Sequence, residues 1–360
     1  MNVTVFAPGL FRSRQIAPGP DAEPGAPARD PLRTLGLVLA RATAVSHARE
    51  TFEAALMRMF GVAPEPDVPV APYTAAHDGL DALDGVWLRA DPVHLHAGRD
   101  RLLPIAIAPG AVSVEEAQSL ARALDHHWAA RGLRFVAPVP SRWYVRSTMP
   151  ARVTTRPLTE CLGREAIGTL PEGPDARAWH RVINESQMVL HDHPVNESRA
   201  SRSAVPVNSV WIWGAGSHRP VSRSPVQWVV ATDPLTLGLV ATVPAVSVTQ
   251  IADGGGGDAL PWSGLDGDGL VVRTDLLDAL AVGDMAAWRA ARAALERNWL
   301  VPLVARLRSG ALERIDLIAP DGARAHRLTL DRRALWRFWR RPRHPDGFVA
   351  APPDTSTGAP

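Results

Sequence analysis

The sequence contains no lysine, so all 39 basic residues are arginine, and 37 acidic residues balance them to a net charge of +2. A chain so close to neutral has no general basic surface, which argues against diffuse binding to nucleic acid. There is one cysteine, Cys161, which excludes an internal disulfide and suits the cytoplasm. The near-neutral charge and the single cysteine limit the classes of protein to which the chain can belong, but they do not indicate an activity.

Long apolar runs are also missing. The longest, Leu235 to Val248, is about 14 residues and contains Pro244, whereas a bilayer-spanning helix needs about 20. The N-terminus has no basic segment and reaches Pro8 and Gly9 early, which is not the pattern of a signal peptide. We therefore expect a cytoplasmic protein that does not enter a membrane.

Three segments carry little hydrophobic pattern. Residues 12–32 are rich in proline and predict a long loop, and the glycines of 253–268 break any helix or strand. The stretch 341–360 predicts a disordered tail. The remainder, 1–340, is expected to form a single body, with a possible subdomain at about 85–205.

Helical and strand periods alternate along that body. Helices are predicted at 35–44, 48–60, 113–131, 175–191, 234–240 and 285–308. Ser113, followed three residues later by Glu116, predicts a capping box at the start of the third. Strands are predicted near the N-terminus and at 85–95, 102–107, 135–138, 142–146, 210–213, 226–231, 314–319 and 325–330. The last two are expected to form a hairpin across the turn at Pro320-Asp321-Gly322. Because the two kinds of element interleave, the predicted fold class is α/β, with a mixed sheet and flanking helices.

The segment 87–100 is dense in polar side chains. His94 and His96 would share one face of a strand, where two imidazoles can hold a metal ion. The alternative is that Arg89, Asp91 and the histidine pair form a satisfied polar network. We favour the network, because no cysteine or glutamate joins the pair at a suitable spacing.

A second dense segment runs from 184 to 216. Asn184, Gln187 and His191 would project from one helical face, a row able to bind a polar ligand. Arg199 and Arg202 can supply charge to a phosphate, or can pair with Glu185 or Glu197. Asn196 and Asn208 suit either loop clamps or substrate contacts, and Trp211 and Trp213 fit a core better than a ligand site.

The same segment carries a family resemblance. His-Pro-Val-Asn at 193–196, Arg199, Arg202, Pro206, Asn208 and Ile212-Trp-Gly-Ala-Gly216 resemble the signature of archaeal-type cofactor-independent phosphoglycerate mutases. A bacterial offshoot of those mutases, the regulatory protein E family of the regulation-of-pathogenicity-factors cluster, resembles nearly the whole chain. That wider resemblance rests on Trp87 to Leu95, Arg142-Trp-Tyr144, Asn184-Glu-x-Gln-Met188 and Trp336 to Arg341.

The mutase resemblance implies an alkaline-phosphatase-like fold with two divalent metals and a transiently phosphorylated serine. Its first metal ligand is an Asp before Gly at the end of the first strand, where this sequence has Pro8-Gly9. The family's other ligand clusters and its nucleophile stretch have no counterpart here. In addition, Ser203 stands where the mutases have glycine, so a positive φ there would strain the turn.

These features favour a degenerate phosphomutase-like protein that regulates through a ligand or a protein partner and needs no metal cofactor. A phosphorylated small molecule is the natural ligand, and no membrane or nucleic acid is expected. The alternatives are residual mutase or phosphatase activity with Mn or Mg held by His94, His96, His191 and His193, or a purely structural role for both segments. The candidate ligand-binding residues are Arg89, Asp91, His94, Asn184, Gln187, His191, His193, Asn196, Arg199 and Asn208.

Overall fold

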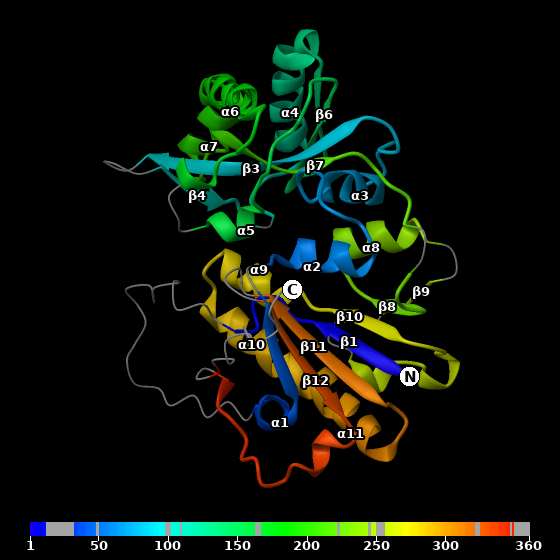
Figure 1. Ribbon diagram of the computed structural model, residues 1–360. Coiled ribbons are helices and arrows are strands. Elements are labelled where there is room, and N and C mark those ends of the chain that lie inside the picture. Colours follow the sequence, from blue (N-terminus) through cyan, green and yellow to red (C-terminus); the bar gives the residue numbers. More distant parts are fainter. Residues whose placement is uncertain are drawn as a thin grey trace, which may run out of the picture. The chain divides into compact units, whose positions relative to one another are not determined.

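The chain folds into two compact units, seen in the computed structural model (Figure 1). The structure describes residues 1–11, 32–47, 50–97, 102–108, 110–162, 167–221, 224–243, 246–249, 256–320, 325–345 and 348. Unit 1 comprises 1–59, 223–236 and 243–360, and unit 2 comprises 60–222 and 237–242. The body expected over 1–340 thus divides in two, and the suggested subdomain at 85–205 lies inside unit 2.

Unit 1 is built on a seven-stranded mixed sheet of order β2-β12-β11-β1-β10-β8-β9. The first strand lies near its centre and pairs in parallel with β10 and β11. β12 and β2 extend one side in antiparallel pairs. The bounds are β1 Asn2–Phe6, β2 Thr43–His47, β8 Trp228–Val230, β9 Ser247–Val248, β10 Gly269–Val272, β11 Arg314–Pro320 and β12 Ala325–Asp331.

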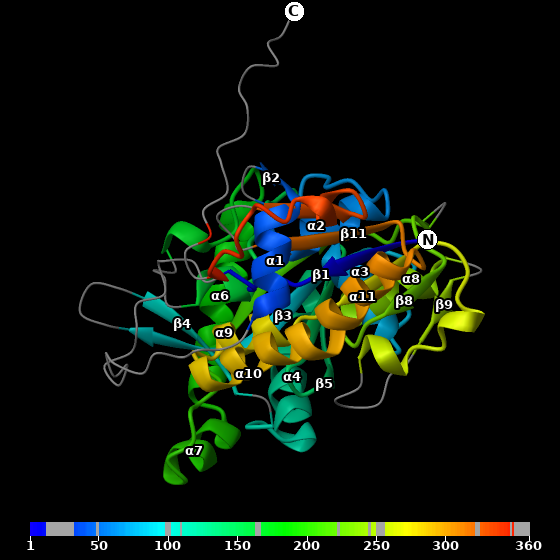
Figure 2. The same cartoon turned by 90° about the horizontal axis from the view of Figure 1, so that it is seen from below.

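Helices cover both faces of this sheet. Residues of α1 (Arg33–Arg41), α10 (Met285–Leu295) and α11 (Val301–Ser309) pack in one core with Val3 and Val5 of β1. On the other face Phe6 meets Phe52 of α2 (Phe52–Met59) edge to face. The opposite faces follow from the alternation of side chains along β1. Figure 2 shows α9 (Asp275–Ala281), α10 and α11 following one another in a line.

A buried carboxylate sits at the start of α1. Glu296, in the π-helical turn Glu296–Leu300 between α10 and α11, accepts hydrogen bonds from the backbone N–H groups of Thr34 and Leu35 at 2.5 and 2.8 Å. Those N–H groups belong to the first helical turn and have no partner inside the helix. The negative charge also lies at the positive end of the helix dipole, so this contact anchors α1.

Unit 2 is built on an antiparallel sheet of order β4-β3-β6-β5, with β7 also paired to β3. α4 and α6 pack on one face against Leu88 and Ala90, and α3 packs on the other against Trp87 and Tyr144. The strands are β3 Val86–Ala97, β4 Leu102–Ala106, β5 Leu133–Val139, β6 Arg142–Ser147 and β7 Ser209–Gly216. The helices are α3 Val70–His77, α4 Val114–Trp128, α5 Leu158–Cys161, α6 Ala176–His191 and α7 Pro194–Ser201, with α8 Pro234–Ala241 shared between the two units.

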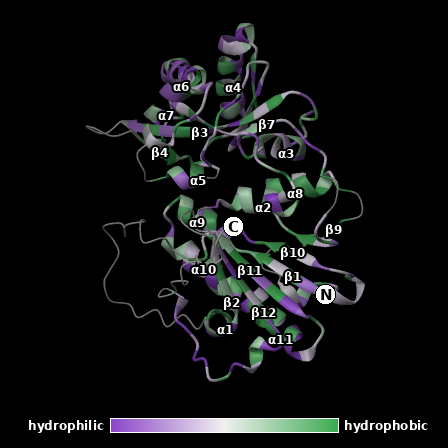
Figure 3. Ribbon diagram, viewed as in Figure 1, coloured by the Kyte–Doolittle hydropathy of each residue, from purple (hydrophilic) through white to green (hydrophobic). Residues whose placement is uncertain are grey.

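Hydropathy follows the expected burial. Figure 3 shows α6 as predominantly hydrophilic and β10 as predominantly hydrophobic. α6 buries only one stripe, including Trp179 and Ile183, whereas all four residues of β10 are buried. Within the described residues, no helix is both long enough and apolar enough to cross a membrane.

The predicted α/β class with a mixed sheet and flanking helices is confirmed, and so is the capping box of Ser113 and Glu116 at the start of α4. Several boundaries are wrong. Residues 43–47 form β2, which takes the end of the helix predicted over 35–44, and Pro194 opens α7 as well as following α6. The helix expected over 285–308 contains the π-helical turn. The loop at 12–31 and most of the tail lie outside the described residues.

Candidate functional site

Arg89 and Asp91 form a buried ion pair on β3. Their side chains share one face of the strand, and Nη2 of Arg89 lies 2.6 Å from Oδ1 of Asp91. Nε1 of Trp213 donates to the other carboxylate oxygen at 2.7 Å. Burial raises the pKa of the Asp91 carboxyl, and the adjacent Arg89 charge opposes that shift. Both residues are only 6% exposed, so the pair is closed to solvent.

Aromatic rings and a second ion pair complete this network. The Arg89 guanidinium lies 5.3 Å from the ring centre of Tyr144 and 5.2 Å from that of Trp213. The Tyr144 hydroxyl donates to Asp78 at 2.6 Å, and Arg142 donates to the same carboxylate at 2.6 and 2.9 Å. Burial alone would raise the pKa of Asp78, but the hydrogen bonds from Arg142 and Tyr144 outweigh it and hold that pKa below its usual range.

The histidine pair stands apart from that network. Nδ1 of His94 lies 3.0 Å from the carbonyl oxygen of Pro206, and the rings of His94 and His96 are 6.3 Å apart between centres. Among the described residues, no three or more His, Cys, Asp or Glu side chains gather as metal ligands would. The alternative ligand set of His94, His96, His191 and His193 is therefore not assembled.

Asn196 clamps the chain on both sides of α7. Its Nδ2 donates to the carbonyl oxygens of Leu190 and Val207 at 2.7 and 2.8 Å, and its Oδ1 accepts from the Val207 N–H at 2.9 Å. Asn208 binds β3 in the same manner, exchanging hydrogen bonds with the N–H and carbonyl of Leu95 at 2.7 and 3.0 Å. Both side-chain amides form their hydrogen bonds with backbone groups, so they act as loop clamps.

Arg199 is the most deeply buried charge of the signature, at 1% exposure. It donates to the carbonyl oxygens of Val205 and Ala111 and forms an ion pair with Glu116 at 2.8 Å. Arg202 reaches the other oxygen of Glu116 at 2.6 Å. The predicted pairing with Glu185 or Glu197 is wrong, because the capping box of α4 presents Glu116 to both arginines.

The row on α6 faces solvent. Asn184 and His191 are exposed, and Gln187 is half-buried on the same side of the helix. His193 instead begins α7, where its ring nitrogen accepts a hydrogen bond from the Val195 N–H at 3.2 Å. Burial lowers the pKa of His193, which favours the neutral ring that can accept that bond.

The candidate residues consequently do not form one pocket. Arg89 and Asp91 lie on the face of the sheet opposite Leu88 and Ala90, and α6 packs on the Leu88 and Ala90 face. The sheet therefore separates the buried ion pair from the α6 row, which also points away from the sheet. The ten residues fall into four places: Arg89 with Asp91, His94 with Asn208, His193 with Asn196 and Arg199, and Asn184 with Gln187 and His191.

Sequence reasoning missed a second buried carboxylate in unit 2. Asp67, 3% exposed, accepts hydrogen bonds from the N–H groups of Thr155 and Ala215 at 3.2 and 3.0 Å and from the Thr155 hydroxyl. Burial raises the pKa of Asp67. Asp78 was missed as well. The sequence pointed to Asp78 only indirectly, through the Arg142-Trp-Tyr144 stretch of the family resemblance. Both hydrogen-bond partners of Asp78 lie in that stretch.

In unit 1 the carboxyl ends of the parallel strands meet at one edge of the sheet, where α/β proteins commonly bind ligands. β1 leads into Pro8, which offers no side-chain oxygen. Asp275, after β10, is paired with Arg273 at 2.9 Å, and Asp233, after β8, accepts from the Thr236 N–H at 2.8 Å. Burial, opposed by Thr274 and aided by Asp275 and Asp233, raises the pKa of Asp278 to about 6. Oδ2 of Asp233 has no hydrogen-bond partner, but among the described residues these carboxylates do not gather as metal ligands would, so they do not fit a two-metal centre.

Comparison with known proteins places the chain near one group of enzymes. No family model matches. Curated 2,3-bisphosphoglycerate-independent phosphoglycerate mutases of Methanosarcina mazei and Methanosarcina barkeri are 29% and 31% identical to it over 149 and 150 residues. Those stretches are 41% of this chain and 36% and 37% of the relatives. The match thus spans little more than a third of each mutase.

Solved structures give a similar but weaker likeness. The cofactor-independent phosphoglycerate mutase of Thermoplasma acidophilum aligns over 91% of this chain and 89% of its own, with 16% identity and a TM-score of 0.41. A Pyrococcus horikoshii protein aligns over 92% and 87%, with 14% identity and a TM-score of 0.47. The sequence matches show that the chain is related, over part of its length, to cofactor-independent phosphoglycerate mutases.

Proposed function

We propose that this protein is a non-catalytic relative of the mutases, of the regulatory protein E kind, and acts in the cytoplasm by binding rather than by phosphotransfer. The observation that carries the proposal is the carboxyl end of β1. There the mutase resemblance calls for a metal-ligating Asp, and this chain has Pro8 followed by Gly9 in a buried turn.

That turn is packed shut. The Gly9 N–H donates to the Pro320 carbonyl at 3.1 Å, and Nε1 of Trp288 donates to the Gly9 carbonyl at 2.9 Å. A Cβ atom added at Gly9 would lie 3.1 Å from the backbone of Leu277, and the φ of Gly9 is +79°. Backbone and indole groups therefore pack tightly around Gly9, and the residue before it, Pro8, has no side-chain oxygen to bind a metal.

A phosphorylated small molecule is the ligand we propose, and a protein partner is the other means of regulation. Guanidinium groups suit phosphate because they bind its oxygens through paired N–H donors. The signature arginine Arg199 is excluded from that role, since it is already bound to Glu116 and to backbone carbonyls. The ligand must therefore use other arginines.

The deciding experiment measures metal content and phosphoglycerate mutase turnover on one purified sample, with added Mn²⁺ and with a chelated control. The Methanosarcina mazei mutase, assayed in parallel, is the positive control. We expect less than stoichiometric metal and no turnover above background. Stoichiometric metal with chelator-sensitive turnover would overturn the proposal.

Residual phosphotransfer is the second candidate, favoured by the activity that the relatives' names state. It requires Mn or Mg at ligands other than the four histidines first considered, because those side chains do not gather. Asp233, Asp275 and Asp278 are the carboxylates to substitute first if the assay finds turnover.

A further inference from the structure

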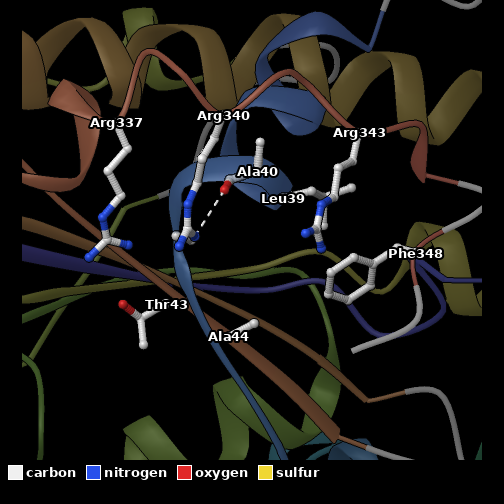
Figure 4. A pocket seen from close by; sticks show the side chains of 9 residues that line it. Leu39, Ala40, Thr43, Ala44, Arg337, Arg340, Arg343 and Phe348 are labelled. Carbon is white, nitrogen blue, oxygen red and sulfur yellow. Dashed lines mark hydrogen bonds between the residues drawn. The ribbon is translucent and has the colours of Figure 1, made fainter. Parts of the chain in front are cut away.

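Three arginines outside the predicted site line a cavity in unit 1. They follow β12 at every third position, as Arg337, Arg340 and Arg343, and the cavity has a volume of about 340 Å³. Figure 4 shows their side chains projecting side by side into the same hollow, beside the end of α1 and the start of β2. The spacing of three residues thus brings three guanidinium groups to one place.

Two of the three are held by the end of α1. Nη1 of Arg337 donates to the carbonyl of Arg41 at 2.8 Å, and Nη1 of Arg340 approaches the carbonyl of Ala40 at 3.4 Å. Cationic side chains at a helix C-terminus satisfy carbonyls that lack a partner in the helix. Each guanidinium has five N–H donors, so one such contact orients the group and leaves most of its donors available.

These charges differ from those of unit 2, where Arg89, Arg142 and Arg199 each meet a carboxylate. Within the described part of the chain, no carboxylate is paired with Arg337, Arg340 or Arg343. Like charges around one cavity repel each other, and an anion placed among them relieves that repulsion. The cavity is therefore suited to an anion with several charged oxygens.

The remaining walls favour an organic group attached to that anion. Leu39 and the ring of Phe348 line the cavity beside Arg343, and Thr43 adds a hydroxyl (Figure 4). The Phe348 ring is held against Phe11, at 5.0 Å between ring centres. Cavities of about 300–1,000 Å³ with apolar walls and a few polar groups are typical of small-molecule sites.

We propose that Arg337, Arg340 and Arg343 form a binding site for a ligand with two or more neighbouring phosphoryl groups and an apolar or aromatic substituent. This proposal rests on the proposed function, in which the protein binds a phosphorylated small molecule, and it identifies the site where that molecule would bind. The same chemistry occurs in a soluble nucleoside diphosphate and in a phosphorylated lipid headgroup. The exposed side chains of Trp336, Phe338 and Trp339 adjoin the site and make the second source worth testing.

The test is isothermal titration of the full chain with pyrophosphate and with adenosine diphosphate. Arg343→Gln is the informative variant, because its exposed side chain makes no hydrogen bond to any residue that the structure describes. Arg341→Gln is the matched control, an exposed arginine two positions away that does not line the cavity. We expect binding by the parent chain, a loss of about tenfold or more in Arg343→Gln, and a change of less than about twofold in Arg341→Gln.

A vesicle arm separates the two sources. Sedimentation with vesicles of phosphatidylcholine containing a phosphoinositide bisphosphate, against pure phosphatidylcholine, reports a headgroup. Binding of free adenosine diphosphate that depends on Arg343 supports the soluble ligand, and Arg343-dependent binding to the phosphoinositide vesicles alone supports the lipid. Equal losses in both variants, or no binding in either arm, would overturn the site. Mutase turnover is measured separately, so catalysis by the chain would refute the proposed loss of activity without touching this site.

Discussion

Arg199 of unit 2 and Arg343 of unit 1 carry the same guanidinium group in opposite settings. Arg199 is 1% exposed and joins α7 to α4 through Glu116 and two backbone carbonyls. Arg343 is exposed and lines a cavity with two other arginines. The comparison teaches that partners decide what an arginine does, even where a family signature draws attention to the buried one.

The largest expected effect is on Arg199. Replacement by methionine removes the ion pair and leaves the carbonyls of Val205 and Ala111 without their donor, so we expect a loss of about 3–5 kcal/mol in the free energy of unfolding. Urea unfolding followed by tryptophan fluorescence measures it. Arg202→Gln is the matched control, since its 56%-exposed side chain shares Glu116 and should cost less than about 1 kcal/mol. If both variants lost the same free energy of unfolding, the burial of Arg199 would not explain its contribution to stability.

A second comparison sets Asp278 of unit 1 against Asp78 of unit 2. Burial, with Asp275 and Asp233 nearby, raises the pKa of Asp278 to about 6, whereas Arg142 helps to hold that of Asp78 down. A raised carboxyl pKa means that the native state binds the proton more tightly, so this contribution to stability falls as the pH rises from about 4 to 6. Because the Asp278 side chain is exposed, solvent screens this shift, and the full difference in the free energy of unfolding should be no more than about 1–2 kcal/mol.

Asp278→Asn should therefore be more stable than the parent at pH 8 and match it near pH 4. The measurement is the urea midpoint as a function of pH. Asp78→Asn serves as the opposite case, because it removes the charge that pairs with Arg142 and should be less stable than the parent at pH 8. A parent-like pH profile for Asp278→Asn would show that this carboxyl titrates normally.

A smaller effect is expected at Ser203, which follows α7 with a φ of +57°, the only positive φ of a non-glycine residue in the described chain. Ser203 stands where the resembling mutases have glycine, so this positive φ is the backbone strain that the sequence predicted. Ser203→Gly should gain about 1 kcal/mol, since glycine adopts that region without steric cost. Ser201→Gly, within α7, is the control and should lose stability.

The smallest expected effect on stability is that of Arg343, and it tests the comparison of Arg343 with Arg199. Arg343→Gln should change the free energy of unfolding by less than about 0.5 kcal/mol, because an exposed side chain without a described partner supports little of the fold. Thermal unfolding in phosphate-free buffer measures it. A loss as large as that of Arg199→Met would make Arg343 a structural residue and remove the basis for reading its cavity as a ligand site.

Local signals in the sequence predicted local structure well. The capping box of Ser113 and Glu116 and the antiparallel pair of β11 and β12 depend on residues close together in the chain, and both are present. Several elements were missed, and two of them show how weak a signal can be. β2 lies within a pattern that also suits a helix, and β10 is a buried strand of four residues beside a glycine-rich segment.

The site was harder to predict because its partners are distant in sequence. Nothing near Arg199 indicates that it pairs with Glu116, 83 residues away, rather than with Glu197. Nor does the sequence show that the sheet of unit 2 separates Arg89 from the row on α6. Residue types identified which side chains were polar and clustered, whereas the register and the faces of the sheet decided which of them meet.

The central place of β1 also bears on how the chain is made. Val3 pairs with Gly269 on one side and Ile315 on the other, so on the ribosome the first strand emerges long before either neighbour exists. At about 5–20 residues per second, that interval is on the order of 15 to 60 s. The main segment of unit 2, residues 60–222, is complete well before then. Unit 2 can thus fold first, before β1 acquires either of its partner strands.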